Sequence, residues 1–310
     1  MAVKLDFSSA EAMRKRLTKT QQKQIERLYK QAAKDIAKRA SQAPRVPSDG
    51  LKKWYLNHLK DQLNEQIDSM RTKIEGITRN NMSRVAQEVV KDSKEFLKAF
   101  EMPIRGVYSH VPDDIVRTVA SGQLYEGNWT LSRALWKDSV RTQKDINSIV
   151  ATGIAENKSA YDIAKDLEKY VDPSAKKDWD WSKVYPNTKR KVDYNAQRLA
   201  RTMVSHAYQQ SFVRTTQKNP FVVSYRWESS NSDRTCEICA ERDGQLFPKD
   251  DLPLDHPNGM CTFTAVMDES MDEIADRLAD WVEGKDDPAL DTWAEDLYGT
   301  VDKTTIQRRR

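Results

Sequence analysis

Two long stretches of this chain contain almost none of the residues that interrupt helices. Residues 8–40 contain neither Gly nor Pro, and residues 51–101 contain no Pro and a single Gly, Gly76. Because Pro and Gly are the least favourable residues in a helix interior, the two stretches predict two long helices, separated by the Pro- and Gly-containing residues 43–50. The second stretch is compatible with one very long helix or with a helical hairpin broken near Gly76 or Asn80-Asn81.

Apolar residues recur at helical spacing in both stretches, which predicts a buried face on each helix. In the second stretch they are Trp54, Leu59, Leu63, Ile67, Met70, Ile74 and Ile77, and in the first they are Ile25, Leu28, Tyr29, Ala32 and Ile36. The opposite face of the first helix is basic, with Lys19, Lys23, Arg27, Lys30, Lys34 and Lys38. Helices of such length usually pack against neighbours, so we expect an oligomeric or complex-bound protein.

The rest of the chain predicts shorter elements. Helices are expected over residues 113–120, 130–157, 159–170 and 191–218, strands over 221–227, 246–247 and 261–266, and acidic helices over 271–299. The predicted fold class is mainly α with a small α+β C-terminal module and an elongated helical N-terminal arm. The expected domains are a basic helical arm (1–102), a helical middle domain (103–219), a small β-containing Cys/His module (220–268) and an acidic helical C-terminal segment (269–310).

Charge is distributed unevenly along the chain. The formal net charge is +4, yet residues 1–100 carry 22 Lys and Arg against 12 Asp and Glu, whereas residues 268–296 carry 2 against 12. This polarity predicts different partners for the two ends. The basic stripe of the first helix would contact DNA phosphates without reading bases; the alternative is that both charged regions are simply solvated helix faces.

Three Cys residues are present, and two of them form the motif Cys236-Glu-Ile-Cys239. No apolar run approaches the roughly 18 residues of a membrane helix, and the N-terminus contains no apolar stretch typical of a signal peptide. We therefore expect a cytoplasmic protein without membrane contact. In a reducing compartment a CxxC motif indicates metal or redox chemistry rather than a disulfide framework.

The predicted metal ligands are Cys236, Cys239, His256 and Cys261. Three thiolates and an imidazole suit tetrahedral zinc, and a closed set of four ligands is typical of a structural site, which has no open position for water. Such a metal would also hold together a β unit whose own core is small. In the alternative interpretation Cys239 and Cys261 are apolar packing residues, and His256 supports the turn 256–259.

Enzyme signatures are weak. The segment Leu254-Asp255-His256-Pro257-Asn258 is similar to the Asp-His core of small ββα metal nucleases, but no His follows Cys261 to complete their ligands. There is no Gly-rich phosphate loop, no GxSxG and no HExxH motif. His206 is expected to be a packed or solvent-facing helix residue. We therefore predict that the chain is not an enzyme.

Several segments together resemble the head-morphogenesis proteins similar to protein F of phage Mu. The strongest match runs through Trp227-Glu228-Ser229, residues 233–239, Asp243-Gly244, Phe247-Pro248, His256-Pro257-Asn258 and Cys261; weaker matches are the helix 199–208 and the segment 131–136. The resemblance covers roughly residues 127–266. One position departs from it: many relatives have His-Pro-Asn-Cys-x-Cys, whereas Gly259 stands here in place of the first of those cysteines.

The resemblance implies a minor capsid (head) structural protein of a tailed phage. Such a protein is present in few copies, associates with the portal, and acts in head morphogenesis and in DNA packaging or ejection. The implied partners are the portal protein, other head proteins and DNA bound without sequence specificity, and the implied location is the virion, after assembly in the host cytoplasm. The alternative function is that of a metal-dependent nuclease acting on phage DNA.

Overall fold

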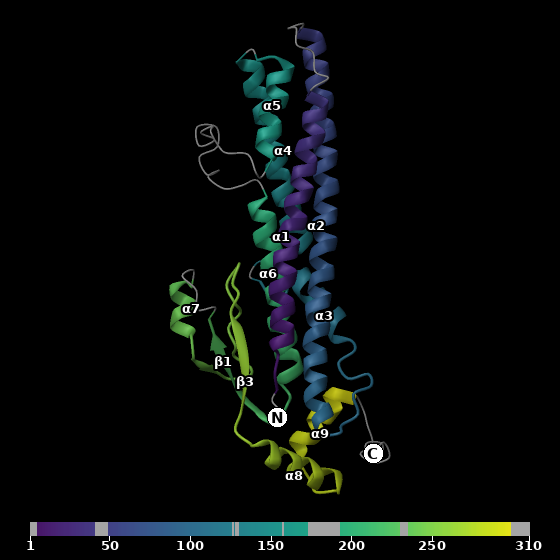
Figure 1. Ribbon diagram of the computed structural model, residues 1–310, viewed down its shortest axis with the longest axis vertical. Coiled ribbons are helices and arrows are strands. Elements are labelled where there is room, and N and C mark those ends of the chain that lie inside the picture. The colour runs from purple at the N-terminus through teal and green to yellow at the C-terminus, as the bar shows by residue number, and fades with distance from the viewer. Residues whose placement is uncertain are drawn as a thin grey trace. The chain divides into compact units, whose positions relative to one another are not determined.

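A computed structural model describes residues 5–40, 49–125, 127, 130–156, 158–172, 193–229 and 235–298 (Figure 1). Its helices and strands confirm the predicted fold class, mainly α with a small sheet in the C-terminal region. In chain order the elements are α1 (Ser8–Ala40), α2 (Asp49–Ala99), α3 (Val111–Ser121), α4 (Leu131–Ala155), α5 (Ala160–Val171), α6 (Tyr194–Thr216), β1 (Val222–Glu228), α7 (Glu237–Arg242), β2 (Leu246–Phe247), β3 (Thr262–Met267), α8 (Met271–Val282) and α9 (Pro288–Tyr298).

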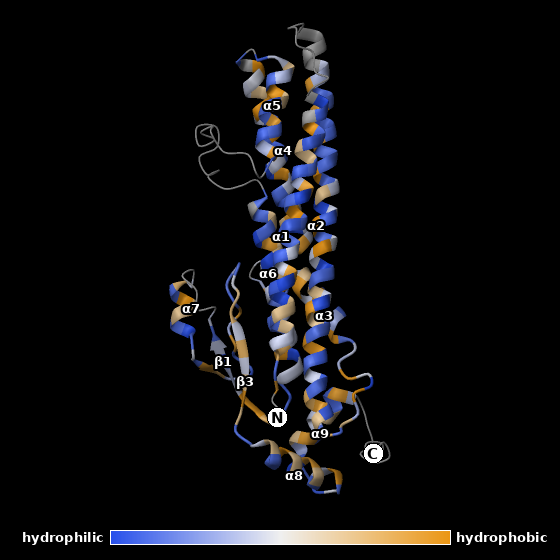
Figure 2. Cartoon of the chain, in the orientation of Figure 1, coloured by the Kyte–Doolittle hydropathy of each residue, from blue (hydrophilic) through white to orange (hydrophobic). Residues whose placement is uncertain are grey.

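The structure of α2 distinguishes between the single-helix and the hairpin interpretation of residues 51–101. It is one continuous helix of 51 residues, so the hairpin interpretation is wrong. Leu59, Leu63, Ile67, Met70 and Ile74 of the predicted stripe are buried, and hydrophobic positions recur along α1 and α2 in Figure 2. Trp54 differs from the prediction: its side chain is 62% exposed and stacks on His58. Within the described residues, no helix is long and apolar enough to cross a membrane.

The chain forms two compact units. The first comprises residues 1–17, 79–120 and 202–310, and the second comprises residues 18–78 and 121–201. The first unit therefore combines the start of α1, the C-terminal part of α2, α3, most of α6 and the sheet with α7, α8 and α9. The division into four domains along the sequence remains a prediction.

A three-stranded antiparallel sheet lies in the first unit, in the order β2-β1-β3. Aromatic residues attach it to α6: the ring of Phe212 lies 5.1 Å from that of Tyr225 and 6.0 Å from that of Phe263. On the central strand, Trp227 pairs with Phe263 across the sheet and is fully buried. Because aromatic residues bury the largest apolar areas, this cluster fixes the sheet against α6.

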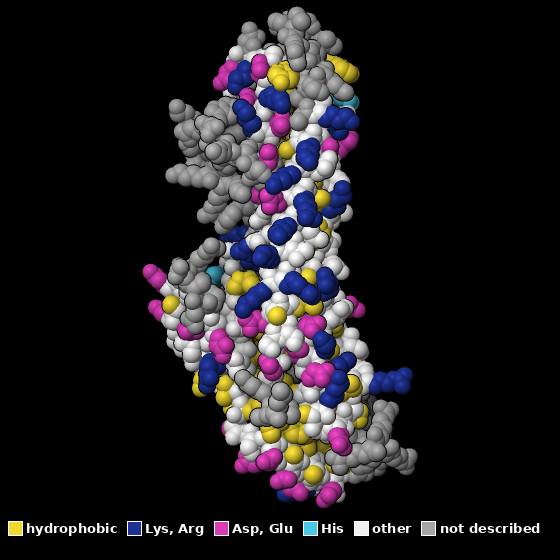
Figure 3. All heavy atoms as spheres, in the orientation of Figure 1, with side chains coloured by type: hydrophobic (Ala, Val, Ile, Leu, Met, Phe, Trp, Pro, Cys, Tyr) yellow, Lys and Arg dark blue, Asp and Glu magenta, His cyan; other side chains and the backbone are white. Residues whose placement is uncertain are grey.

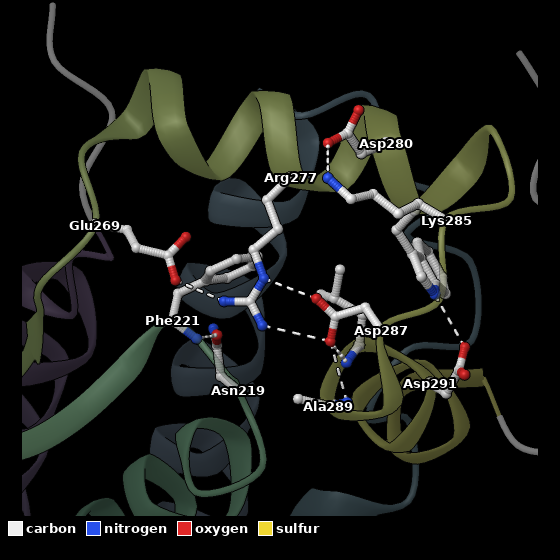
Figure 4. A network of polar contacts seen from close by, with 11 residues as sticks. Asn219, Phe221, Glu269, Arg277, Asp280, Lys285, Asp287, Ala289 and Asp291 are labelled. Carbon is white, nitrogen blue, oxygen red and sulfur yellow. Dashed lines mark hydrogen bonds and ion pairs between the residues drawn. The ribbon is translucent and has the colours of Figure 1, made fainter.

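Arg277 links the acidic C-terminal helices α8 and α9 (Figure 4). Arg277 of α8 pairs with Glu269 and Asp287, and its guanidinium lies over the ring of Phe221. Asp287 also accepts hydrogen bonds from the backbone N–H groups of Ala289 and Leu290 at the start of α9. The Arg277 guanidinium lowers the pKa of Asp287. Some of the excess acidic residues of this segment therefore form ion pairs within the fold.

Asp92 of α2 holds the beginning of α1 and makes the first unit sensitive to pH. Its buried carboxylate accepts the Ala10 backbone N–H at 2.8 Å, and burial raises its pKa to about 6. Since the folded-state pKa exceeds the unfolded one, the folded state is favoured by protonation of this carboxyl. This contribution to stability is complete below about pH 4 and is lost as the pH rises through about 6, where the buried carboxyl becomes charged. The free energy of unfolding should therefore fall by an amount on the order of 2 kcal/mol as the pH rises through about 6. Asp92→Asn should remove this dependence, whereas Asp61→Asn, at an exposed position, should leave it intact. Identical pH profiles for the wild type and Asp92→Asn would show that Asp92 contributes nothing.

Candidate metal centre

Short elements of the sheet region carry the predicted metal ligands. Cys236 directly precedes α7, and Cys239 lies in its first turn, so that one helical turn brings the two side chains to the same side. His256 lies in the loop between β2 and β3, and Cys261 is the last residue before β3. Because Glu228 at the end of β1 pairs with Thr262 at the start of β3, α7 and the part of this loop next to Cys261 lie at the same end of the sheet.

The structure brings these side chains together. His256 Nε2 lies 3.2 Å from Cys236 Sγ, and Cys261 Sγ lies 3.3 Å from Cys239 Sγ. The donor atoms of Cys236, Cys239 and His256 all lie within 4.8 Å of one another, as do those of Cys239, Asp255 and Cys261. Cys239 belongs to both sets, so the predicted ligands form one cluster around its sulfur.

The ligand types are those that zinc binds, and two of their separations are close to those of a tetrahedral site. Ligand atoms of a tetrahedral zinc site are about 3.5–3.8 Å apart, given Zn–S and Zn–N bonds of about 2.3 and 2.0–2.1 Å. The two contacts of 3.2 and 3.3 Å require only small outward movements to reach that spacing. Asp255 would not be needed, because three thiolates and one imidazole already complete four ligands. Cys236 and His256 are partly exposed, whereas Cys239 and Cys261 are each 3% exposed.

The thiols differ in their electrostatic surroundings. The backbone N–H of Cys239, together with the Cys239 thiol and His256, lowers the pKa of Cys236. Burial raises the pKa values of Cys239 and Cys261. A metal ion binds thiolates, and its positive charge would stabilise the deprotonated form of the two buried sulfurs.

Asp255 organises the loop that carries His256 and Cys261. Its carboxylate accepts the backbone N–H groups of His256, at 2.9 Å, and of Cys261, at 3.3 Å. A Cβ atom at Gly259 would lie 2.2 Å from both Asp255 oxygens. This close approach gives a physical reason for Gly259: a Cys there, as in many relatives, would collide with the carboxylate unless Asp255 moved.

The helix α6 holds the same loop with four polar side chains. Gln209 donates to Pro253 O and accepts from Asp255 N, and His206 Nε2 lies 2.9 Å from Asp255 O. Ser205 donates to Gly259 O, and Thr202 accepts from Asn258 N. Burial lowers the pKa of His206 to about 4, so its imidazole is neutral at pH 7 and its Nε2–H donates to the Asp255 carbonyl. Of the two roles expected from the sequence, packed or solvent-facing, His206 has the packed one, and it also holds the loop.

Arg14 of α1 was not identified from the sequence. Its side chain is 1% exposed, donates to Cys261 O at 2.8 Å and to Met260 O at 2.9 Å, and lies over the Tyr208 ring. Its local sequence signal is that it lies outside the basic stripe, at helical spacing from Ala10 and Leu17, which are buried. The ligand loop is therefore supported by α1 and α6 as well as by any metal.

The predicted DNA-binding residues lie in the second unit. Lys19, Lys23, Arg27, Lys34 and Lys38 are exposed, whereas Lys30 is half-buried and pairs with Glu26 at 2.8 Å. The opposite face is buried at Ile25, Tyr29, Ala32 and Ile36. Lys and Arg side chains are frequent over the visible surface of α1 (Figure 3).

These features define a helix-rich protein with a Cys- and His-containing cluster built on a small antiparallel sheet. Residues 144–284 match the family described as phage Mu protein F like protein. The match confirms the resemblance found in the sequence, and the chain is similar to this family over a segment that includes α6, all three strands and the whole cluster. No curated protein and no solved structure matches the chain.

Proposed function

We propose that the chain is a minor head protein of a tailed phage that associates with the portal and acts in head morphogenesis and in DNA packaging or ejection. The observation that carries this proposal is the family match over residues 144–284. The long helices α1 and α2 add extended surfaces suited to contacts with other head proteins. The protein is assembled into the head in the host cytoplasm and is a component of the virion.

In this proposal the Cys/His cluster holds a structural zinc. Four protein ligands fill a tetrahedral zinc shell, so no position remains where the ion could activate water. The ion would join α7 to the loop 253–261, which α6 and Arg14 already hold. The cluster thus serves as a scaffold rather than as a catalytic centre.

Co-purification with the portal protein tests the proposed association. Tagged chain and untagged portal protein of the same phage are produced together, and the complex is captured through the tag and separated by size. We expect the portal protein to be retained through washes at about 0.5 M salt, where interactions between exposed charges are largely screened. Retention that disappears at this salt, or that occurs equally with an unrelated basic helical protein, would contradict a specific association.

DNA binding by α1 is the next part of the proposal. The five exposed cations of the stripe, changed together to Gln, should weaken the binding of duplex DNA at low salt. Each phosphate contact that the exchange removes reduces the salt slope by about 0.9, which a titration at several salt concentrations measures. The control exchanges five exposed cations of other helices for Gln: Lys73, Arg84, Arg117, Arg141 and Lys144. If both variants bind alike, the stripe is only a solvated face. Deletion of residues 1–40 is a poorer test, since it also removes the buried Arg14.

The rival function is a metal-dependent nuclease. The adjacent Asp255 and His256 favour it, but His256 Nε2 faces the Cys236 sulfur and the Asp255 carboxylate is engaged by the loop backbone. Incubation of the purified protein with duplex DNA and Mg²⁺ or Mn²⁺ separates the two functions. A nuclease would cleave the DNA and lose this activity in His256→Ala. We expect no cleavage by either protein.

A further inference from the structure

Thiols that lie close together can form disulfides as well as bind a metal. We propose that, without the metal, the cluster is a dithiol–disulfide site that is oxidised by low-molecular-weight disulfides. Every internal disulfide that it forms contains Cys239. All three cysteines are free thiols in the structure. Cys239 Sγ lies 3.3 Å from Cys261 Sγ and within 4.8 Å of Cys236 Sγ. The inference rests on the proposed metal site, whose regulation it describes.

The position of Cys236 makes it the entry point of the reaction. Its side chain is partly exposed at the start of α7, whereas Cys239 and Cys261 are each only 3% exposed. A dissolved disulfide such as oxidised glutathione therefore meets Cys236 first. The Cys236 thiolate attacks one sulfur of the reagent, forming a mixed disulfide and releasing one molecule of glutathione as thiolate.

Cys239 then completes the internal disulfide. Its sulfur attacks Cys236 Sγ and expels the second glutathione as thiolate, which takes up the proton that Cys239 loses. In total, two protein thiols lose two electrons and two protons, and the oxidised glutathione gains them as two molecules of reduced glutathione. Cys261 can afterwards attack Cys239 Sγ, which moves the disulfide to the buried pair Cys239–Cys261 and returns Cys236 to a free thiol.

The surrounding structure keeps the thiols together when no metal is bound. Asp255, the side chains of α6 and Arg14 hold the loop that ends at Cys261 through protein hydrogen bonds alone. Cys239 is held through α7, because the Arg242 guanidinium lies 5.0 Å from the centroid of the Trp227 ring and Gly244, two residues after α7, donates its backbone N–H to Trp227 O. The two sulfurs of the buried pair therefore stay close enough to react. In the reducing host cytoplasm the thiols would bind zinc. In the oxidising medium around the virion the zinc would be lost and two of the thiols would form a disulfide.

The test treats the full chain with oxidised glutathione after removal of metal by a chelator, and in parallel after addition of zinc. Remaining thiols are alkylated, and tryptic peptides are analysed by mass spectrometry. A Cys236–Cys239 disulfide leaves the peptide 235–242 lacking two hydrogens, whereas Cys239–Cys261 joins two peptides. In the chelated wild type we expect one internal disulfide per chain that contains Cys239, and with zinc we expect at least about tenfold slower oxidation.

Variants make the assignment specific. Cys239→Ser should form no internal disulfide and should retain glutathione on Cys236, whereas Cys261→Ser should still form Cys236–Cys239. Three free thiols in the chelated wild type, a Cys236–Cys261 disulfide, or only disulfides between chains would overturn the inference. Failure of the zinc proposal would give a different result: the disulfide would form equally fast with and without added zinc. Circular dichroism of each variant, before oxidation, identifies any that fails to fold.

Discussion

Cys239→Ser is expected to abolish zinc binding and to lower the stability of the first unit more than any other single change at the cluster. Wild-type protein made in a reducing cytoplasm should carry about one zinc per chain, and Cys239→Ser close to none, because Cys239 is the ligand shared by both groups of donor atoms. Binding of a metal to the folded state alone stabilises that state, so loss of the zinc should lower the free energy of unfolding by about 3 kcal/mol or more. Metal analysis and thermal unfolding measure the two effects.

Chelation supplies the matched control for this prediction. A chelator should lower the melting temperature of the wild type to that of Cys239→Ser and should leave the variant unchanged, because the variant has no zinc to lose. Since α6 and α1 contact the loop directly, the loss should extend to these helices in hydrogen exchange. If the metal-free wild type has the same melting temperature as the zinc-supplemented protein, the three cysteines are ordinary packing residues and the prediction is wrong.

Arg14→Met is expected to have the second largest effect. The exchange keeps most of the side-chain volume but leaves the carbonyls of Cys261 and Met260 without the buried donor that they now share. Charge-assisted hydrogen bonds of this kind contribute about 1.5–3 kcal/mol each, and an unsatisfied buried carbonyl costs about 1–3 kcal/mol. We expect a loss of about 3 kcal/mol in the free energy of unfolding, together with weaker retention of zinc.

Arg16→Met is the control for Arg14→Met. Arg16 is exposed on the same helix, two residues further along the chain, so its exchange should change stability by less than about 0.5 kcal/mol. Chemical denaturation of both variants, with and without a chelator, separates the effect on folding from that on metal binding. Equal stability of the two variants would show that Arg14 does not support the loop.

Local patterns in the sequence predicted the fold class and the cluster because both depend on residues close together in the chain. The absence of Pro and Gly indicated the long helices, and the CxxC motif with His256 and Cys261 indicated ligands that the structure brings together. The supports of the loop were not predictable in this way. Arg14 lies 247 residues from Cys261, and Gln209 lies 46 residues from Asp255, so only the three-dimensional fold reveals these contacts.

Two smaller differences have the same origin. Trp54 has helical spacing within the apolar stripe of α2 yet is exposed, because helical periodicity gives the side of a helix but not whether a neighbour covers it at that level. Gly259 departs from the pattern of many relatives, and only the position of the Asp255 carboxylate explains why a side chain is excluded there.

The proposal that the chain is a minor head protein can be checked by quantitative mass spectrometry of particles purified from the phage that encodes it. Peptides of the chain are measured against those of the portal protein and the major capsid protein, both in full particles and in particles that have released their DNA. We expect the chain to co-sediment with particles at a few copies each, in constant ratio to the portal protein. Its absence from washed particles, with the protein found only in the soluble fraction of the lysate, would contradict the proposed function.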